Sequence, residues 1–139
     1  MSLDRFLEAQ CHAYDDALAE LRGGRKQSHW MWFVFPQISG LGHSPTARFY
    51  AIKDLSEAHA YLNHPILGAR LRACSEALLG IQGRSANEIF GSPDDMKLKS
   101  SMTLFASVAG SESLFTAVLE KYFHGEMDRL TLDKVSSEL

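Results

Sequence analysis

Long hydrophobic runs are absent from this sequence of 139 residues, and proline and cysteine are scarce. No stretch approaches the roughly 20 apolar residues that a membrane-spanning helix needs. The amino terminus reaches Asp4 and Arg5 before any hydrophobic run begins, so a secretory signal is not expected. We therefore predict a cytoplasmic protein that contacts no membrane.

The two cysteines, Cys11 and Cys74, are too few for the disulfide framework of a small secreted domain. Both stand among apolar residues with helical spacing, which predicts reduced, buried thiols. The six histidines contain no HExxH pattern, and neither cysteine has a CxxC partner. The sequence therefore predicts no metal site and no cofactor.

Charge of one sign is not concentrated anywhere in the chain. Lys and Arg number 14 against 17 Asp and Glu, the formal net charge is -3, and no block of like charges occurs. A nucleic acid polymer is therefore not an expected partner. With 45% hydrophobic residues, a chain of this length buries a core without disulfides or metals, which predicts one domain over residues 1–139.

Apolar residues recur at helical spacing through most of the sequence. The clearest stripe follows Pro65 and comprises Leu67, Leu71, Cys74, Leu78 and Ile81. Similar stripes occupy residues 3–21, 98–105 and 115–122. We predict an all-α fold of about six to eight short to medium helices, with no significant sheet.

Capping residues mark where several of these helices begin. Two pairs have the spacing of a capping box: Asp54 with Glu57, and Ser85 with Glu88. Ser44 precedes Pro45 as an N-cap, and residues 92–95 supply a cap, a proline and first-turn acids. From Thr131 the chain is short and polar, which predicts a loosely docked turn of helix.

Residues 28–35 form an aromatic run, Ser-His-Trp-Met-Trp-Phe-Val-Phe, whose periodicity does not separate a buried strand from a buried helix. No second run offers a partner strand, and an isolated hairpin is marginal in water. We therefore predict a short buried helix, capped by Ser28 and ended before Pro36. Its aromatic side chains either fill the core or line a pocket that stacks on a flat ring.

Two glycines, Gly40 and Gly42, stand in the loop that leads to the Ser44 helix start. Such a loop exposes backbone N–H groups beside the positive end of a helix, where phosphate and carboxylate groups bind, and Arg48 adds charge one turn on. A tight turn explains the same glycines, and the loop has neither the P-loop lysine nor a preceding strand. Both interpretations stay open at the level of sequence.

The segment Asp94–Thr103 is rich in functional groups. Asp94, Lys97 and Ser101 share one helical stripe. Its adjacent serines point roughly 100° apart, and no oriented histidine and acid accompany them, so a serine hydrolase is not indicated. Capping acids and surface ion pairs explain most of this composition.

The string Ser28–Gln37 with the Gly40–Gly42 turn resembles the signature of domain-of-unknown-function family 1810. Residues 64–71 and 89–105 extend the resemblance over nearly the whole chain. It implies a mainly helical bacterial protein and brings with it no reaction, cofactor or catalytic residue. The shared signature includes polar and glycine positions that packing alone does not obviously require: His29, Gln37, Gly40, Gly42, Asp94, Lys97 and Ser100.

Our leading hypothesis is a pocket for a small anionic ligand, a nucleotide or phosphorylated metabolite, where the aromatic run, the glycine loop and the Pro93 helix start converge. The expected ligand-binding residues are Trp30, Trp32, Gln37, Gly40, Gly42, Ser44, Arg48, Asp94, Lys97 and Ser100. If the site is catalytic, His29 and His43 are the acid–base candidates.

The competing hypothesis is a noncatalytic interaction module, in which the tryptophans form an exposed patch for a protein partner or for a second copy of the chain. The protein is then a monomer or a homodimer. The sequence leaves open whether the protein is an enzyme. The two hypotheses differ in where the indole rings point.

Overall fold

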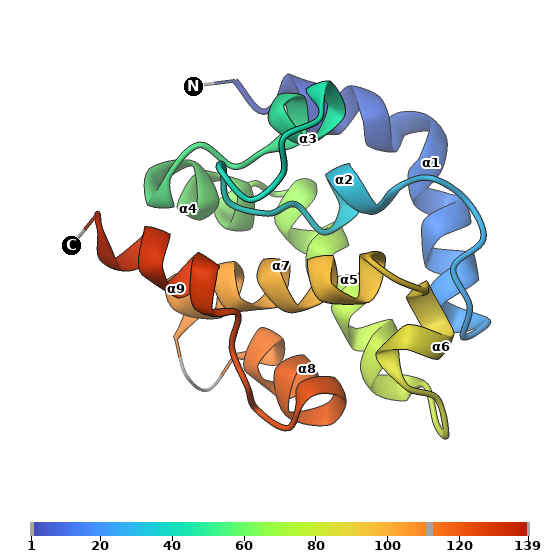
Figure 1. Cartoon of the computed structure of the whole chain (residues 1–139). Coiled ribbons are helices and arrows are strands. Elements are labelled where there is room, and N and C mark those ends of the chain that lie inside the picture. Colours follow the sequence, from blue (N-terminus) through green and yellow to red (C-terminus); the bar gives the residue numbers. More distant parts are fainter. Residues whose placement is uncertain (1, 111–112, 139) are drawn as a thin grey trace.

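Helices make up the regular structure of the protein (Figure 1). The computed structural model describes residues 2–110 and 113–138, and within these ranges it contains no strand, only an isolated parallel bridge between Ile38 and Ile52. The helices are α1 (Asp4–Arg22), α2 (Met31–Val34), α3 (Pro45–Tyr50), α4 (Leu55–Asn63), α5 (Leu67–Gly80), α6 (Ala86–Phe90), α7 (Asp94–Ala109), α8 (Leu114–Phe123) and α9 (Arg129–Ser136). The predicted all-α class is confirmed.

α5 and α7 lie at the centre of the packing. α1 and α4 pack against α5, α8 packs against both α5 and α7, and α9 lies against α7 (Figure 1). One cluster of buried apolar side chains contains residues from α1, from α2 and from every helix from α4 through α9. Its largest fully buried members are aromatic: Trp30, Tyr61, Phe6, Phe35, Phe105 and Phe115. Burial of this area is the main favourable term in folding.

Side-chain caps explain where five of the helices begin. The N-cap residues that accept a hydrogen bond from their own helix are Ser44, Asp54, Ser85, Ser113 and Asp128. The predicted capping box of Ser85 and Glu88 is confirmed in both of its hydrogen bonds. Asp54 accepts from Glu57 N at 2.9 Å, but the Glu57 carboxylate accepts from Lys53 N instead of from the cap, so this box is incomplete.

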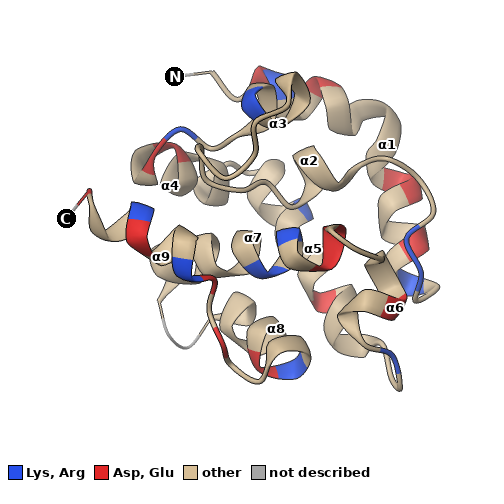
Figure 2. Ribbon diagram, in the orientation of Figure 1, with Lys and Arg blue, Asp and Glu red and all other residues tan. Residues whose placement is uncertain are grey.

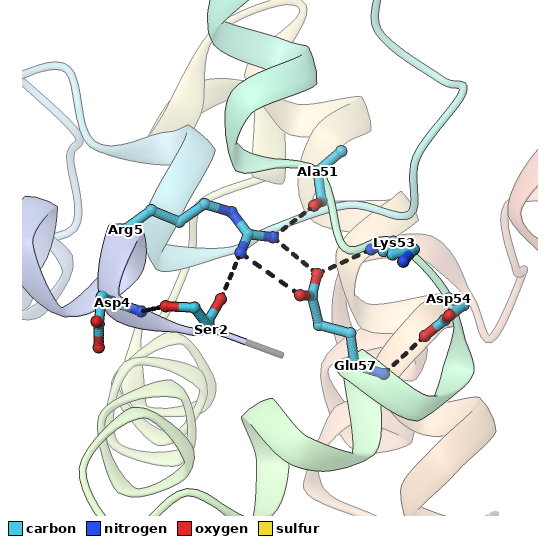
Figure 3. A network of polar contacts seen from close by, with 7 residues as sticks. All are labelled: Ser2, Asp4, Arg5, Ala51, Lys53, Asp54 and Glu57. Atoms are coloured by element: carbon cyan, nitrogen blue, oxygen red, sulfur yellow. Dashed lines mark hydrogen bonds and ion pairs between the residues drawn. The ribbon is translucent and has the colours of Figure 1, made fainter.

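The Glu57 carboxylate is used by a long-range ion pair that the capping pattern did not reveal (Figure 3). Arg5 on α1 donates to it from both terminal nitrogens, at 2.7 Å and 3.4 Å, and also to Ala51 O at 2.9 Å. The side chain of Glu57 is 4% exposed. A two-pronged contact of this kind is directional as well as charged, so it fixes the start of α4 against α1.

Two of the predicted caps are wrong. α2 begins at Met31, and the Ser28 hydroxyl instead donates to Glu20 Oε2 at 2.5 Å. α7 begins at Asp94 with Pro93 at the N-cap, so Ser92 does not cap it. Ser28 stands two positions before the N-cap residue of α2, Trp30, and Ser92 one position before that of α7, Pro93, so neither serine occupies the capping position.

Two predictions about burial also fail. Cys74 is buried, but Cys11 is exposed on the outer side of α1. The segment after Thr131 is not loosely docked, since α9 packs on α7 and buries Thr131 and Val135. A helix with two inward residues among polar ones has too little apolar sequence to be recognised, yet it covers the core here.

Glu20, near the end of α1, organises the connection to α2. Its carboxylate accepts hydrogen bonds from Gln27 N at 2.6 Å, from the backbone and hydroxyl of Ser28, and from Trp30 Nε1 at 2.9 Å. Desolvation raises the pKa of Glu20, but these hydrogen bonds outweigh it and lower the pKa to about 2. The ionised carboxylate therefore holds the chain that leads into α2.

We expect Glu20→Gln to lower the free energy of unfolding at pH 7 by about 1 kcal/mol, because its charge-assisted hydrogen bonds are partly screened by solvent. The pKa of Glu20 is lower in the folded state than its ordinary value of 4.5, so its stabilisation is present above about pH 5 and is lost as the pH falls towards 2. Urea denaturation from pH 7 to pH 2.5 measures this. The free energy of unfolding of Glu20→Gln should approach that of the wild type at low pH. The control Glu76→Gln, at an exposed position, should follow the wild type at every pH. A constant gap between Glu20→Gln and the wild type at every pH contradicts the assignment.

Candidate functional site

Three segments that are distant in the sequence meet around one cavity of about 230 Å³, which we call the Trp32 pocket. α2 and the following loop form one wall, the start of α7 the second, and the start of α9 the third. The lining residues are Trp32, Gln37, Leu41, Gly42, Pro93, Met96, Lys97, Ser100, Asp128 and Leu130. The structure thus brings together five residues that the sequence analysis named: Trp32, Gln37, Gly42, Lys97 and Ser100.

The two tryptophans of the aromatic run have different environments. Trp30 is 1% exposed in the core, while Trp32 is half-buried and faces the cavity. The end of α2 is held in place because the carbonyl of Phe33 accepts hydrogen bonds from Gln10 Nε2 at 2.7 Å and from the Tyr61 hydroxyl at 3.2 Å. The aromatic run therefore contributes Trp30 to the core and Trp32 to the pocket wall.

Lys97 places a positive charge on the pocket wall. Its Nζ lies 3.6 Å from the centre of the Trp32 ring, a cation–π contact, and 3.3 Å from Asp94 Oδ1. The other oxygen of Asp94 lies 3.0 Å from Lys26 Nζ. Two ammonium groups therefore share one carboxylate, which leaves a local excess of positive charge beside the indole. Figure 2 shows the acidic residues at the start of α7 and the basic residues just after them.

Two polar groups in the pocket wall are not used by the fold. The side-chain amide of Gln37 and the indole N–H of Trp32 make no hydrogen bond to any residue that the structure describes. Ser100, by contrast, donates to Met96 O at 3.2 Å. Gln37 and Trp32 are therefore the side chains best placed to donate to or accept from a ligand.

The α9 wall of the pocket was missed by sequence reasoning. Asp128 caps α9, and its Oδ2 accepts from the backbone and hydroxyl of Thr131. The backbone N–H of Asp128 donates to Thr103 Oγ1 at 2.9 Å, and Lys99 pairs with Glu126 just before it. These contacts fasten the start of α9 to α7. The available signal was the N-cap spacing from Asp128 to Thr131, one turn before the segment that the sequence predicts as helical.

Both glycines of the loop have structural reasons to be glycine. Gly40 has φ +96°, and a Cβ there would lie 2.5 Å from Lys134 Nζ. A Cβ at Gly42 would lie 2.6 Å from the Cβ of Ala47. The loop is held at its ends by Ser39 N donating to Ile52 O, and by Ala47 N donating to the Ser44 hydroxyl. The tight-turn interpretation therefore fits Gly40, whereas Gly42 is explained by its close approach to Ala47.

Seven predicted site residues do not line the cavity: His29, Trp30, Gly40, His43, Ser44, Arg48 and Asp94. Trp30 belongs to the core, and its N–H is satisfied by Glu20. Ser44 caps α3, and Arg48 is exposed on that helix. His29 and His43 are exposed outside the lining. Asp94 acts on the pocket only through Lys97.

The buried titratable groups of the core are poorly suited to reaction. Burial raises the pKa of the Cys74 thiol to about 12 and raises that of Tyr61 as well, so both stay protonated near neutral pH. Within the described ranges no group of three His, Cys, Asp or Glu side chains is arranged to hold a metal ion. No described helix combines the length and apolar character needed to cross a membrane.

A solved protein structure is similar to this chain over nearly its full length. The crystal structure of the conserved hypothetical protein Rv1873 from Mycobacterium tuberculosis matches with a TM-score of 0.94 and 52% sequence identity, over 96% of each chain. A comparison with curated proteins finds no match. The family described as protein of unknown function (DUF1810) matches residues 1–135, so the chain belongs to that family.

Proposed function

We propose that the protein binds a small anionic molecule with a flat ring, of the nucleotide or phosphorylated-metabolite class, in the Trp32 pocket. The observation that carries this proposal is the contact of Lys97 Nζ with the Trp32 ring on the wall of the cavity. An aromatic face with an adjacent cation offers stacking and charge to one ligand. The unused polar groups of Gln37 and Trp32 supply further hydrogen bonds.

The size and chemistry of the cavity limit the ligand. Its volume of about 230 Å³ is below the roughly 300–1,000 Å³ of typical ligand sites, which favours one ring system over a dinucleotide. Five apolar side chains face it: Trp32, Leu41, Pro93, Met96 and Leu130. Asp128 is the one carboxylate in the lining, and its hydrogen bonds to Thr131 commit it to capping α9. The proposal is for binding, and we assign no catalytic step to it.

A thermal-shift screen against nucleotides, sugar phosphates and simple anions tests this function, followed by calorimetric titration of any ligand found. A ligand at 100 times its dissociation constant adds about 2.7 kcal/mol, which raises the melting temperature by several degrees. We expect Trp32→Ala and Lys97→Ala each to weaken binding about tenfold or more. Lys53→Ala, which removes an exposed lysine outside the pocket, should bind like the wild type. No shift across the library, or equal binding by all three variants, rejects the proposal.

The alternative function is docking of a protein at the pocket mouth. It is favoured by the exposure of two apolar side chains there, Met96 at 49% and Leu130 at 62%. The buried Trp30 does not contribute to such a surface, so the patch differs from the one predicted from sequence. If this alternative holds, Leu130→Asp abolishes self-association in analytical ultracentrifugation or capture of a partner, while small anions produce no thermal shift.

A further inference from the structure

Lys134 on α9 stands out among the lysines near the pocket because its charge is not used by the fold. Lys26 and Lys97 pair with Asp94, and Lys99 pairs with Glu126. Lys134 Nζ has no carboxylate partner and donates no side-chain hydrogen bond among the described residues, although the side chain is half-buried. Holding an unpaired ammonium group partly out of water costs free energy unless a ligand or water compensates it.

The end of the Lys134 side chain lies against Gly40. A Cβ at Gly40 would lie 2.5 Å from Nζ and 2.7 Å from Cε, so the ammonium group rests directly against the backbone of the loop. The backbone φ of +96° at this position favours glycine, and the missing Cβ leaves room for the lysine. The contact joins two segments almost 100 residues apart in the sequence.

The backbone of the same loop offers hydrogen-bond donors. The N–H groups of residues 40–43 donate to no residue that the structure describes, while Ser39 N and Ala47 N on either side are bonded within the fold. Gly40, in this loop, lies against the Lys134 ammonium group. Backbone N–H groups and a cation in one region concentrate positive potential, which binds oxyanions such as phosphate.

This positive region is continuous with the Trp32 pocket. Leu41 and Gly42, from the same loop, line the cavity. Leu130 lines it from α9, and Lys134 follows Leu130 by four residues, so the two side chains lie on the same face of that helix. The region around Gly40 therefore adjoins the pocket where the loop meets α9.

We propose that Lys134 and the N–H groups of residues 40–43 form a subsite for the anionic group of the ligand, while its ring lies against Trp32. The ligand class is then a single aromatic or heterocyclic ring system with one terminal phosphate, as in a nucleoside monophosphate. This inference rests on the proposed function of the Trp32 pocket. It assigns the ligand's anionic group to Lys134, which has no carboxylate partner among the described residues, while Lys97 adds positive charge beside the ring.

The test compares the four ribonucleoside monophosphates with their parent nucleosides by calorimetric titration at low salt. The pairs differ only in the phosphate, so the ratio of their affinities measures the subsite. We expect the wild type to bind the preferred monophosphate about tenfold tighter than its nucleoside. Lys134→Gln should remove that preference without weakening the nucleoside, and Lys134→Arg should retain it. Lys53→Gln, which removes a lysine outside the pocket, is the matched control.

The failures of this inference and of the proposed function are distinguishable. If the wild type binds nucleoside and monophosphate equally and Trp32→Ala abolishes both, the phosphate subsite is wrong and the ring-binding part of the pocket function stands. The subsite is also wrong if Lys134→Gln keeps the phosphate preference. If no nucleoside, monophosphate or other anion of the screen binds, both proposals are rejected together.

Discussion

Trp30→Ala is expected to lower the free energy of unfolding by about 3–5 kcal/mol, the range for removing a large buried aromatic side chain. Trp30 is 1% exposed and packs against Phe35 and Phe90, with ring centres 6.2 Å and 6.3 Å away. The substitution also deprives Glu20 of the indole N–H. The cavity it leaves lies where α2 joins the core, so the neighbouring rings can only partly collapse into it.

Trp30→Phe separates the two contributions. It keeps most of the apolar contact and loses the hydrogen bond to Glu20, so the expected loss is about 1–2 kcal/mol. Urea denaturation followed by far-ultraviolet circular dichroism measures both variants, under the two-state behaviour usual for domains of this size. A loss below 1 kcal/mol for Trp30→Ala would show that the indole does not contribute to the core.

Trp32→Ala provides the contrast, because this indole is half-buried at the pocket wall. Its effect on stability should be well below that of Trp30→Ala, since less area is lost and solvent already reaches the site. Trp32→Ala should weaken ligand binding more than Trp30→Ala does. The neighbouring tryptophans therefore differ in role although the sequence presents them alike.

Local sequence signals predicted much of the helical frame. The stripe from Leu67 to Leu78 marks α5, and the caps Ser44 and Ser85 mark the starts of α3 and α6. These features were recognisable because a helix and its cap are encoded within a few residues. Ser28 failed as a cap because its hydroxyl is held by Glu20, eight residues earlier on another element, and spacing rules do not cover such contacts.

The candidate site was only partly predictable for the same reason. The convergence of the Trp32 wall, the glycine loop and the start of α7 followed from their unusual composition. The α9 wall and Lys134 did not, because a polar segment with little apolar periodicity gives no indication of where it docks. Gly40 is an example: the sequence marks it as a special loop position, but nothing in the sequence indicates that Lys134 lies against it.

Gly68→Ala is the second substitution expected to have a large effect. Gly68 is in the first turn of α5, where a Cβ would lie 2.0 Å from the carbonyl oxygen of Leu62 and 2.9 Å from its carbonyl carbon. These are backbone atoms at the end of α4, and they cannot rotate away as a flexible side chain does. α4 and α5 must separate to admit the methyl group, which displaces the buried Leu67 and the contact of Arg72 with Leu62 O. We expect a loss of about 3 kcal/mol or more.

Gly80→Ala is the matched control at the other end of α5. No atom lies within 4 Å of a Cβ placed there, and its backbone does not have positive φ. Alanine is a better helix former than glycine by about 0.8–1.0 kcal/mol, so this variant should be as stable as the wild type or slightly more stable. Urea denaturation of the two variants side by side measures the difference. If Gly68→Ala proves as stable as Gly80→Ala, then α4 and α5 do not pack as closely in solution as the contact at Gly68 requires.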